Sequence, residues 1–217
     1  IWNVPKEQLS ADIRSRWHND MLGMISFVKK KIGNKLLIVN TENNDDYLDA
    51  CDGKMEEGFV HARWHSSLEF KYDCISLVNA LREISKKGKY FMAYSGTERD
   101  GTEADYRRVM LYCFASYLLG YYGDKASFGW MNIYDPSKGY YTEFDDAKRI
   151  GSPTGEYYSI GSVYARNFTN GKVLVNPTSS AYAVDLQGKY KTLDGQIVSE
   201  IVMQAHTGVI LEKWNEQ

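Results

Sequence analysis

Apolar positions in the first part of the chain alternate between helical stripes and short unbroken runs. Residues 10–32 repeat apolar side chains at steps of three and four, which predicts an amphipathic helix that ends at Gly33. Residues 36–39 (Leu-Leu-Ile-Val) are apolar throughout, as is typical of a strand buried on both faces of a parallel sheet. The alternation continues with predicted strands at 54–60, 90–94 and 128–133 and predicted helices at 66–87 and 103–119. This order indicates an α/β fold, built as a parallel sheet or (β/α) barrel.

The pattern changes after about residue 155, where no helical stripe remains. Turn-type dipeptides separate β-rich runs there: Asn170-Gly171, Gln187-Gly188, Asp194-Gly195 and Thr207-Gly208. We therefore predict a (β/α) barrel portion at 1–155 and a C-terminal antiparallel β-module at 156–217. The Tyr-, Gly-, Asp- and Ser-rich segment 134–160 is expected to be a long irregular connection.

Composition excludes several classes of protein. The net charge of −2 over 217 residues is unlike that of a general nucleic-acid binder, and 43% hydrophobic with 25% charged residues excludes a disordered chain. No apolar run reaches the ~18 residues of a membrane helix, so we expect no membrane partner. Three cysteines do not form a disulfide framework and are expected to be reduced. Seventeen Tyr and five Trp suit sugar binding as well as core packing.

Candidate chemistry concentrates between residues 40 and 57, which hold seven carboxylates and one basic residue. Glu42 follows a buried strand, and Glu57 lies at the end of the next one. Sites in parallel sheets and barrels form at the carboxyl ends of the strands. Two carboxylates there can serve as acid and base, or as acid and nucleophile, in glycosidic cleavage. We predict Glu57 and Glu42 as catalytic residues; the alternative is that the loop acids are solvated and one Glu pairs with a nearby Arg.

Polar and aromatic side chains at the same predicted edge are candidates for substrate binding: Asn40, Glu56, Trp64, Tyr94 and Trp130. Indole and phenol rings stack against the apolar faces of sugars. For Trp130, core packing is the competing interpretation.

Sequence motifs give no support for a cofactor or a metal. No Gly-x-Gly-x-x-Gly or P-loop follows a predicted strand. His61 and His65 stand four residues apart, but in a segment that resembles a loop and lacks the Glu of a His-Glu-x-x-His site. A weaker hypothesis is that the acids of 42–57 bind a hard cation, because such ions prefer clustered oxygen ligands.

Two segments carry a resemblance to a family. Residues 52–59 (Asp-Gly-Lys-Met-Glu-Glu-Gly-Phe) resemble a strand of glycosyl hydrolase families with TIM-barrel folds. Residues 165–177 (Ala-Arg-Asn-Phe-Thr-Asn-Gly-Lys-Val-Leu-Val-Asn-Pro) are similar to the segment that opens their terminal β-module. The resemblance implies a hydrolase of polysaccharide in which Glu57 occupies the motif glutamate, while Glu56 replaces an expected apolar residue.

The length departs from that family pattern. A complete eight-stranded barrel needs about 250 residues, and only four strands are predicted before the β-module. The chain begins at Ile1 rather than Met, and we expect it to be the second half of a barrel plus the module. Its open edges are then expected to pair with a second chain or with its own copy. The alternative function is a non-catalytic carbohydrate-binding or structural protein with a degenerate barrel.

Overall fold

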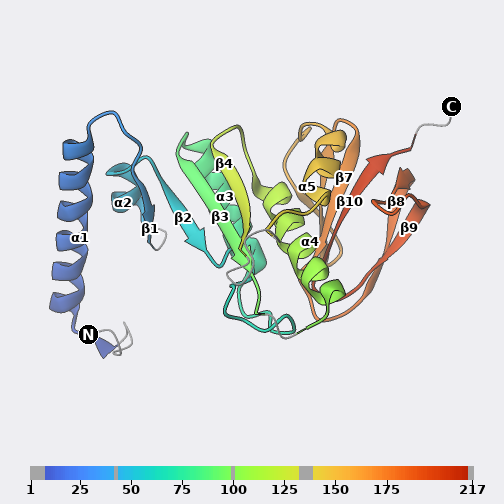
Figure 1. The fold of residues 1–217 in the computed structure, drawn as a ribbon, viewed down its shortest axis with the longest axis horizontal. Helices are drawn as coiled ribbons and strands as arrows, with labels where there is room; N and C mark the ends of the chain where they lie inside the picture. Colours follow the sequence, from blue (N-terminus) through green and yellow to red (C-terminus); the bar gives the residue numbers. More distant parts are fainter. Residues whose placement is uncertain (1–7, 42–43, 99–100, 132–138, 215–217) are drawn as a thin grey trace.

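The computed structural model describes residues 8–41, 44–98, 101–131 and 139–214 (Figure 1). Its first part is an α/β unit whose four strands are all parallel and lie in the order β1-β2-β3-β4. The elements are α1 (Ala11–Ile32), β1 (Ile38–Asn40), α2 (Asp45–Asp49), β2 (Gly53–Glu57), α3 (Cys74–Lys86), β3 (Tyr90–Gly96), α4 (Glu103–Gly120) and β4 (Ala126–Met131). The predicted parallel α/β arrangement is confirmed.

The second part is a separate antiparallel sheet, as predicted. Two short helices, α5 (Glu143–Asp146) and η3 (Ala147–Ile150), lie in the segment that was expected to be irregular. The strands are β5 (Tyr158–Ile160), β6 (Val163–Phe168), β7 (Gly171–Asn176), β8 (Tyr182–Lys191), β9 (Ile197–Met203) and β10 (Thr207–Lys213). Their spatial order is β5-β6-β7-β10-β8-β9, with every pair antiparallel.

The predicted helix at 66–87 begins later than expected, at Cys74. The side chain of Asp73 accepts hydrogen bonds from the backbone N–H groups of Ile75 and Ser76 and so caps α3. The residues before it form a loop in which Leu68, inside the predicted helix, is 75% exposed. The predicted start at residue 66 was therefore wrong, because tertiary contacts of the loop override the local pattern.

Two of the four predicted hairpin turns are placed differently. Gln187-Gly188 lies inside β8, where the pairing with β9 shifts between Asp185 and Tyr190 in a β-bulge. Thr207-Gly208 begins β10 rather than forming the turn before it. Asn170-Gly171 and Asp194-Gly195 do separate consecutive strands. The turn predictions at Gln187-Gly188 and Thr207-Gly208 were wrong because each dipeptide is part of a strand. The pairing partners that extend these strands are distant in sequence, so a local pattern does not show them.

Helix α4 packs between the two sheets and belongs to a core shared by both (Figure 1). The cluster runs from Ile25 on α1, through Phe114 and Tyr117 on α4, to Ile210 on β10. Gly208 allows β10 to approach α4, because a Cβ there would lie 2.5 Å from both the Ala115 Cβ and the Leu111 carbonyl oxygen. Within the described part of the chain, no helix has the length and hydrophobicity needed to cross a membrane.

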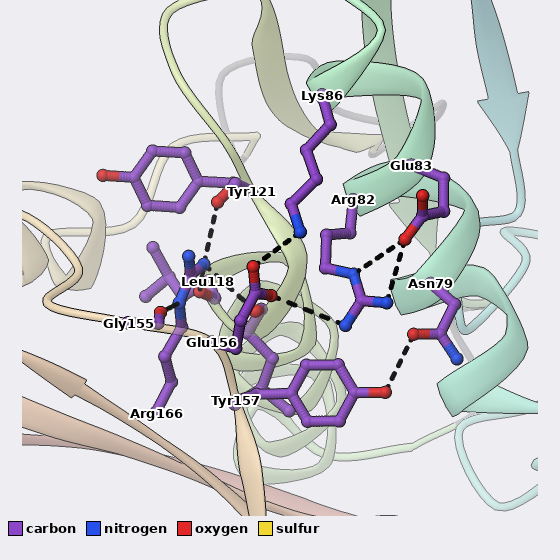
Figure 2. A network of polar contacts seen from close by, with 11 residues as sticks. Asn79, Arg82, Glu83, Lys86, Leu118, Tyr121, Gly155, Glu156, Tyr157 and Arg166 are labelled. Atoms are coloured by element: carbon purple, nitrogen blue, oxygen red, sulfur yellow. Dashed lines mark hydrogen bonds and ion pairs between the residues drawn. The ribbon is translucent and has the colours of Figure 1, made fainter.

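Hydrogen bonds and ion pairs of Arg166 and Glu156 join the β-module to α3 and α4 (Figure 2). We call this group of contacts the polar seam. The buried guanidinium of Arg166 donates to the carbonyl oxygens of Leu118, Leu119 and Tyr121 at 2.8–3.1 Å, at the carboxyl end of α4. A cation at this position complements the helix dipole and the unpaired carbonyl groups. In the same seam Glu156 forms ion pairs with Lys86 and Arg82.

The two faces of the parallel sheet are covered differently. Alternate residues of β3 point to opposite sides, and Phe91, Ala93 and Ser95 are buried whereas Met92 and Tyr94 are half-buried. Phe128, aligned with Ala93, packs against Phe114 of α4, so the buried face is the helical one. We call the other face, which includes Met55, Met92 and Tyr94, the open face.

Helix α1 also has an uncovered stripe. Ile25 is buried, but four of the apolar residues on the neighbouring side of the helix are exposed, namely Ile13, Trp17, Met24 and Phe27. The apolar arc of α1 is therefore wider than the surface that the described residues offer to cover it.

Candidate functional site

Glu57 is the last residue of β2 and lies on the open face beside Asn40, the last residue of β1. Since the strands are parallel, their carboxyl ends meet at one edge of the sheet. The Asn40 Nδ2 donates to Glu57 Oε2 at 3.3 Å. Two residues predicted from separate strands are thus brought into contact.

A sharp reversal follows Glu57 and carries the chain back over this edge. Gly58 has φ +103°, in the region where glycine is favoured, and its N–H and that of Phe59 both donate to the Tyr94 carbonyl oxygen at 2.8 Å. The returning loop places the Arg63 Nε 3.2 Å from Glu57 Oε1. The Arg63 guanidinium lies 5.5 Å from the ring centre of Trp64, which is 45% exposed.

Both carboxylate oxygens of Glu57 have a partner. The Arg63 guanidinium donates to one oxygen and the Asn40 amide donates to the other. The Glu57 side chain is 29% exposed and that of Arg63 35%, so the pair is reachable from solvent. Such a group can attack or stabilise a developing positive centre, or accept a proton from water.

His61 holds the loop against β3. Its Nδ1 lies 2.7 Å from the carbonyl oxygen of Gly96 and its Nε2 lies 3.1 Å from that of Ser66. Burial lowers the pKa of His61 below its usual 6.5, and the two carbonyl contacts act in the opposite direction. The His65 carbonyl oxygen accepts from the Thr97 hydroxyl and from the Glu98 N–H, both at 2.9 Å. The loop that carries Arg63 is therefore fixed to the end of β3.

Tyr94 lies on the open face in register with Glu57. The neighbouring position on β4 is Gly129, where a Cβ would stand 2.9 Å from the Tyr94 ring. The absence of a side chain at Gly129 lets the phenol ring extend across β4. Tyr94, Glu57 and Asn40 therefore share one face and one edge.

Two predicted substrate-binding residues lie elsewhere. Glu56 points to the helical face, where its Oε2 is 2.7 Å from the Nζ of Lys54, which is 1% exposed. Trp130 is aligned with Ser95 on the same helical face and is 8% exposed within the core. The core interpretation of Trp130 matches this placement. Glu42, the second predicted catalytic carboxylate, lies outside the described residues.

Three other acids of this region are paired with bases. Asp46 contacts His18, Asp45 contacts Lys87, and Asp52 contacts Lys29 at 2.6 Å. The hydrogen bond from Lys29 lowers the pKa of Asp52. In the ranges that the structure covers, no group of three or more His, Cys, Asp or Glu side chains is arranged to hold a metal.

The sequence interpretation missed two residues at this edge. Arg63 was not named as a site residue, although the alternative interpretation expected one Glu to pair with a nearby Arg, as Glu57 does with Arg63. Its signal was its place just beyond a strand that ends in a carboxylate. Glu98, exposed, lies two residues past β3, as Glu42 lies two residues past β1.

The chain matches the model of a known family. The model of the family described as hypothetical glycosyl hydrolase family 15 matches residues 3–172, which include the parallel sheet and the start of the β-module. The comparison with curated proteins finds no match.

Proposed function

Because the chain belongs to hypothetical glycosyl hydrolase family 15, we propose that it cleaves glycosidic bonds of a polysaccharide, with Glu57 as one of two catalytic carboxylates. The observation that carries this proposal is the environment of Glu57. The carboxylate stands at the carboxyl edge of the sheet between Asn40 and Arg63, and the Arg63 guanidinium lies 5.5 Å from the ring centre of the exposed Trp64. Trp64 and Tyr94 supply faces for sugar rings, and Asn40 supplies a polar contact.

We assign Glu57, whose two oxygens contact Asn40 and Arg63, to the role that does not donate the proton. This is the nucleophile of a retaining enzyme or the base of an inverting one. The second carboxylate must donate a proton to the leaving oxygen, and Glu42 is our first candidate, with Glu98 as the second. A separation of about 5–5.5 Å between the two carboxyl groups would give retention, and about 6.5–9.5 Å would give inversion.

We further propose that β1–β4 form half of a TIM-like barrel, with the open face toward its interior. The consecutive parallel order supports this, as do the half-buried Met55, Met92 and Tyr94 on a face that no described helix covers. Strands β1 and β4 are the edges of the described sheet and carry unpaired backbone groups on their outer sides. A second chain or a second copy of this chain would complete the barrel there.

The test is release of reducing ends from a panel of polysaccharides. Glu57→Gln is expected to lower kcat by on the order of 10²-fold or more, because an amide neither attacks nor accepts a proton. Glu42→Gln is expected to cost less and mainly in KM. Glu56→Gln, which removes a neighbouring carboxylate on the other face, is the matched control and should retain kcat. Loss of turnover in Glu56→Gln with full turnover in Glu57→Gln would contradict the assignment.

One observation favours the alternative, a non-catalytic sugar-binding protein. Over the described ranges, the hydrogen-bonding and ion-pair partners of Glu57 are Asn40 and Arg63, and neither is a carboxylate. If the unchanged chain releases no reducing ends while Trp64→Ala weakens its binding to the same polysaccharide, the binding function is the correct one.

A further inference from the structure

The six strands of the β-module curl around an apolar core of their own. Its buried members come from β6, β7, β8, β9 and β10: Val163, Ala165, Leu174, Val184, Leu186, Met203 and Leu211. Asn176 and Lys172 stand two residues to either side of Leu174 on β7, so all three point to the same side of the sheet. These two polar residues mark the two ends of the core.

The end at Asn176 is sealed by hydrogen bonds. The Asn176 amide donates to the carbonyl oxygens of Ser180, Met203 and Gln204 at 2.7–3.1 Å. Its own oxygen accepts from the N–H and hydroxyl of Thr178. Every polar atom of this side chain is used within the module, which leaves no group for a ligand.

The end at Lys172 opens into a cavity of about 320 Å³. Lys172 is 5% exposed, its Nζ donates to the Leu186 carbonyl oxygen at 2.8 Å, and it lies 5.1 Å from the ring centre of Tyr190. Further lining residues are Tyr158, Asn167, Gln187 and Lys213. The mouth of a closed or curled sheet is a common place for a small-molecule site. We call this cavity the module mouth.

Two positively charged residues, Lys172 and Lys213, line the module mouth. An ammonium that is removed from water requires compensation by an opposite charge or by several acceptors. No carboxylate in the described part of the chain forms an ion pair with Lys172 or Lys213. Burial lowers the pKa of Lys172, while the charge of Asp185, beyond ion-pair distance, acts in the other direction. The mouth is therefore a place where an anion would stabilise the protein.

The remaining lining suits a ring that bears hydroxyl groups. Tyr158 and Tyr190 offer phenol rings, and the Tyr158 hydroxyl donates to Asn167 Oδ1 at 3.1 Å, which orients the Asn167 amide. The β-bulge of β8 places Gln187, at φ +55°, on the rim. A non-glycine residue held at positive φ is uncommon and is often found at functional positions.

We propose that the module mouth binds a carboxylate-bearing sugar, such as a uronic acid unit of an acidic polysaccharide, with Lys172 and Lys213 facing the carboxylate and the two tyrosines facing the ring. Acceptors of this kind form strong hydrogen bonds with ammonium groups. The site does not involve Glu57. In Figure 1, β2 ends in the lower part of the view, whereas β10 ends in the upper part, near the C-terminus. Binding here would hold an acidic polymer on the protein whether or not Glu57 cleaves it.

The experiment is NMR titration of the isotope-labelled chain with glucuronate and galacturonate. Saturable shifts of the backbone amides of Asn167, Lys172 and Tyr190 are expected, with little response to glucose or galactose at the same concentrations. Equal shifts with acetate would show that an anion is bound without recognition of the sugar and would overturn the proposal. So would the absence of any saturable shift.

Variants locate the site. Lys213→Gln, which changes an exposed residue, and Tyr190→Leu are each expected to weaken uronate binding at least fivefold. Lys191→Gln removes a positive charge on β8 from a residue that does not line the mouth and should leave binding unchanged. Equal weakening in all three variants would reduce the effect to general charge and overturn the assignment. Unfolding curves of each variant confirm that the fold is retained.

Discussion

The two sheets of this protein differ in how completely they bury their side chains. Every residue of β7 in the antiparallel module is buried, since the module curls around one core and packs its outer side on α4. In the parallel sheet, residues 90–95 of β3 alternate between half-buried and buried, because helices cover only one face. Both sides of the module are covered, one by its own core and the other by α4, whereas the parallel sheet has one face that no described helix covers and α1 has an exposed apolar stripe. This difference is why we propose that the sheet is part of a larger barrel.

The largest expected effect compares matched core substitutions in the two sheets. Leu174→Ala in the module should lower the free energy of unfolding by about 2–5 kcal/mol, the range for a fully buried leucine. Met92→Ala on the open face should cost less than about 1 kcal/mol in the isolated chain, because the side chain is half-exposed. Urea denaturation measures both. Equal losses would mean that the open face is as well packed as the module.

Next in size is the seam that joins the two regions. Arg166→Met should cost about 2–3 kcal/mol, since it leaves the last carbonyl groups of α4 without their charged donor. Lys86→Met, which removes an exposed ion pair with Glu156 in the same seam, should cost less than about 1 kcal/mol. If both substitutions cost the same, Arg166 is not the principal fastening.

A smaller effect concerns pH at the junction of the loop, α4 and the module. Burial lowers the pKa of both His61 and His206 below 6.5, so the folded state binds fewer protons than the unfolded state as the pH falls past that value. Stability should therefore be constant above about pH 7 and should decrease from about 6.5 toward 5, at about 1.4 kcal/mol for each unit of pKa difference. Chemical denaturation at a series of pH values gives the curve. His206→Asn should make the decrease shallower, and an increase toward pH 5 would contradict the sign.

Substitutions of exposed apolar residues on α1 are expected to change stability least. They are expected to affect assembly instead. Trp17→Gln and Phe27→Gln should alter the unfolding free energy of the isolated chain by less than about 0.5 kcal/mol, because both rings are exposed. If a second copy covers this stripe, light scattering should show self-association that these variants abolish and Arg14→Gln does not. A monodisperse monomer for the unchanged chain would contradict completion of the barrel by its own copy.

Much of the fold was predictable because the information is local. Runs such as 36–39 and 90–94 reveal buried strands, and turn dipeptides reveal hairpins. The start of α3 was not predictable from the sequence. Ser66 has the sequence of a helix cap but lies in a loop where His61 contacts the carbonyl oxygens of Ser66 and Gly96. Nor was the bulge at Gln187 predictable, since strand pairing on both sides of it depends on distant residues.

The sequence predicted which edge of the sheet carries the candidate site. It did not predict which face of the sheet the site residues lie on. Strand ends place Asn40, Glu57 and Tyr94 together, as the structure shows. A single buried strand does not reveal which of Glu56 and Glu57 faces the helices, because the two differ only by the alternation of the strand. The Arg63 contact depends on the path of a whole loop, so the position of Arg63 just beyond the strand indicates the contact without fixing it. The catalytic roles of Glu57 and Glu42 stay predictions.

The position of Arg166 has a consequence for the order of events on the ribosome. The carbonyl group of Tyr121 receives its donor from a residue 45 positions later in the chain. At about 5–20 residues per second, synthesis takes roughly 2–9 s to reach that residue after α4 has been made. During that interval the last carbonyl groups of the nascent α4 lack the hydrogen bonds from Arg166. The packing of α4 is completed only after Arg166 has been made. Maturation of the N-terminal region is thereby coupled in time to translation of the C-terminal strands.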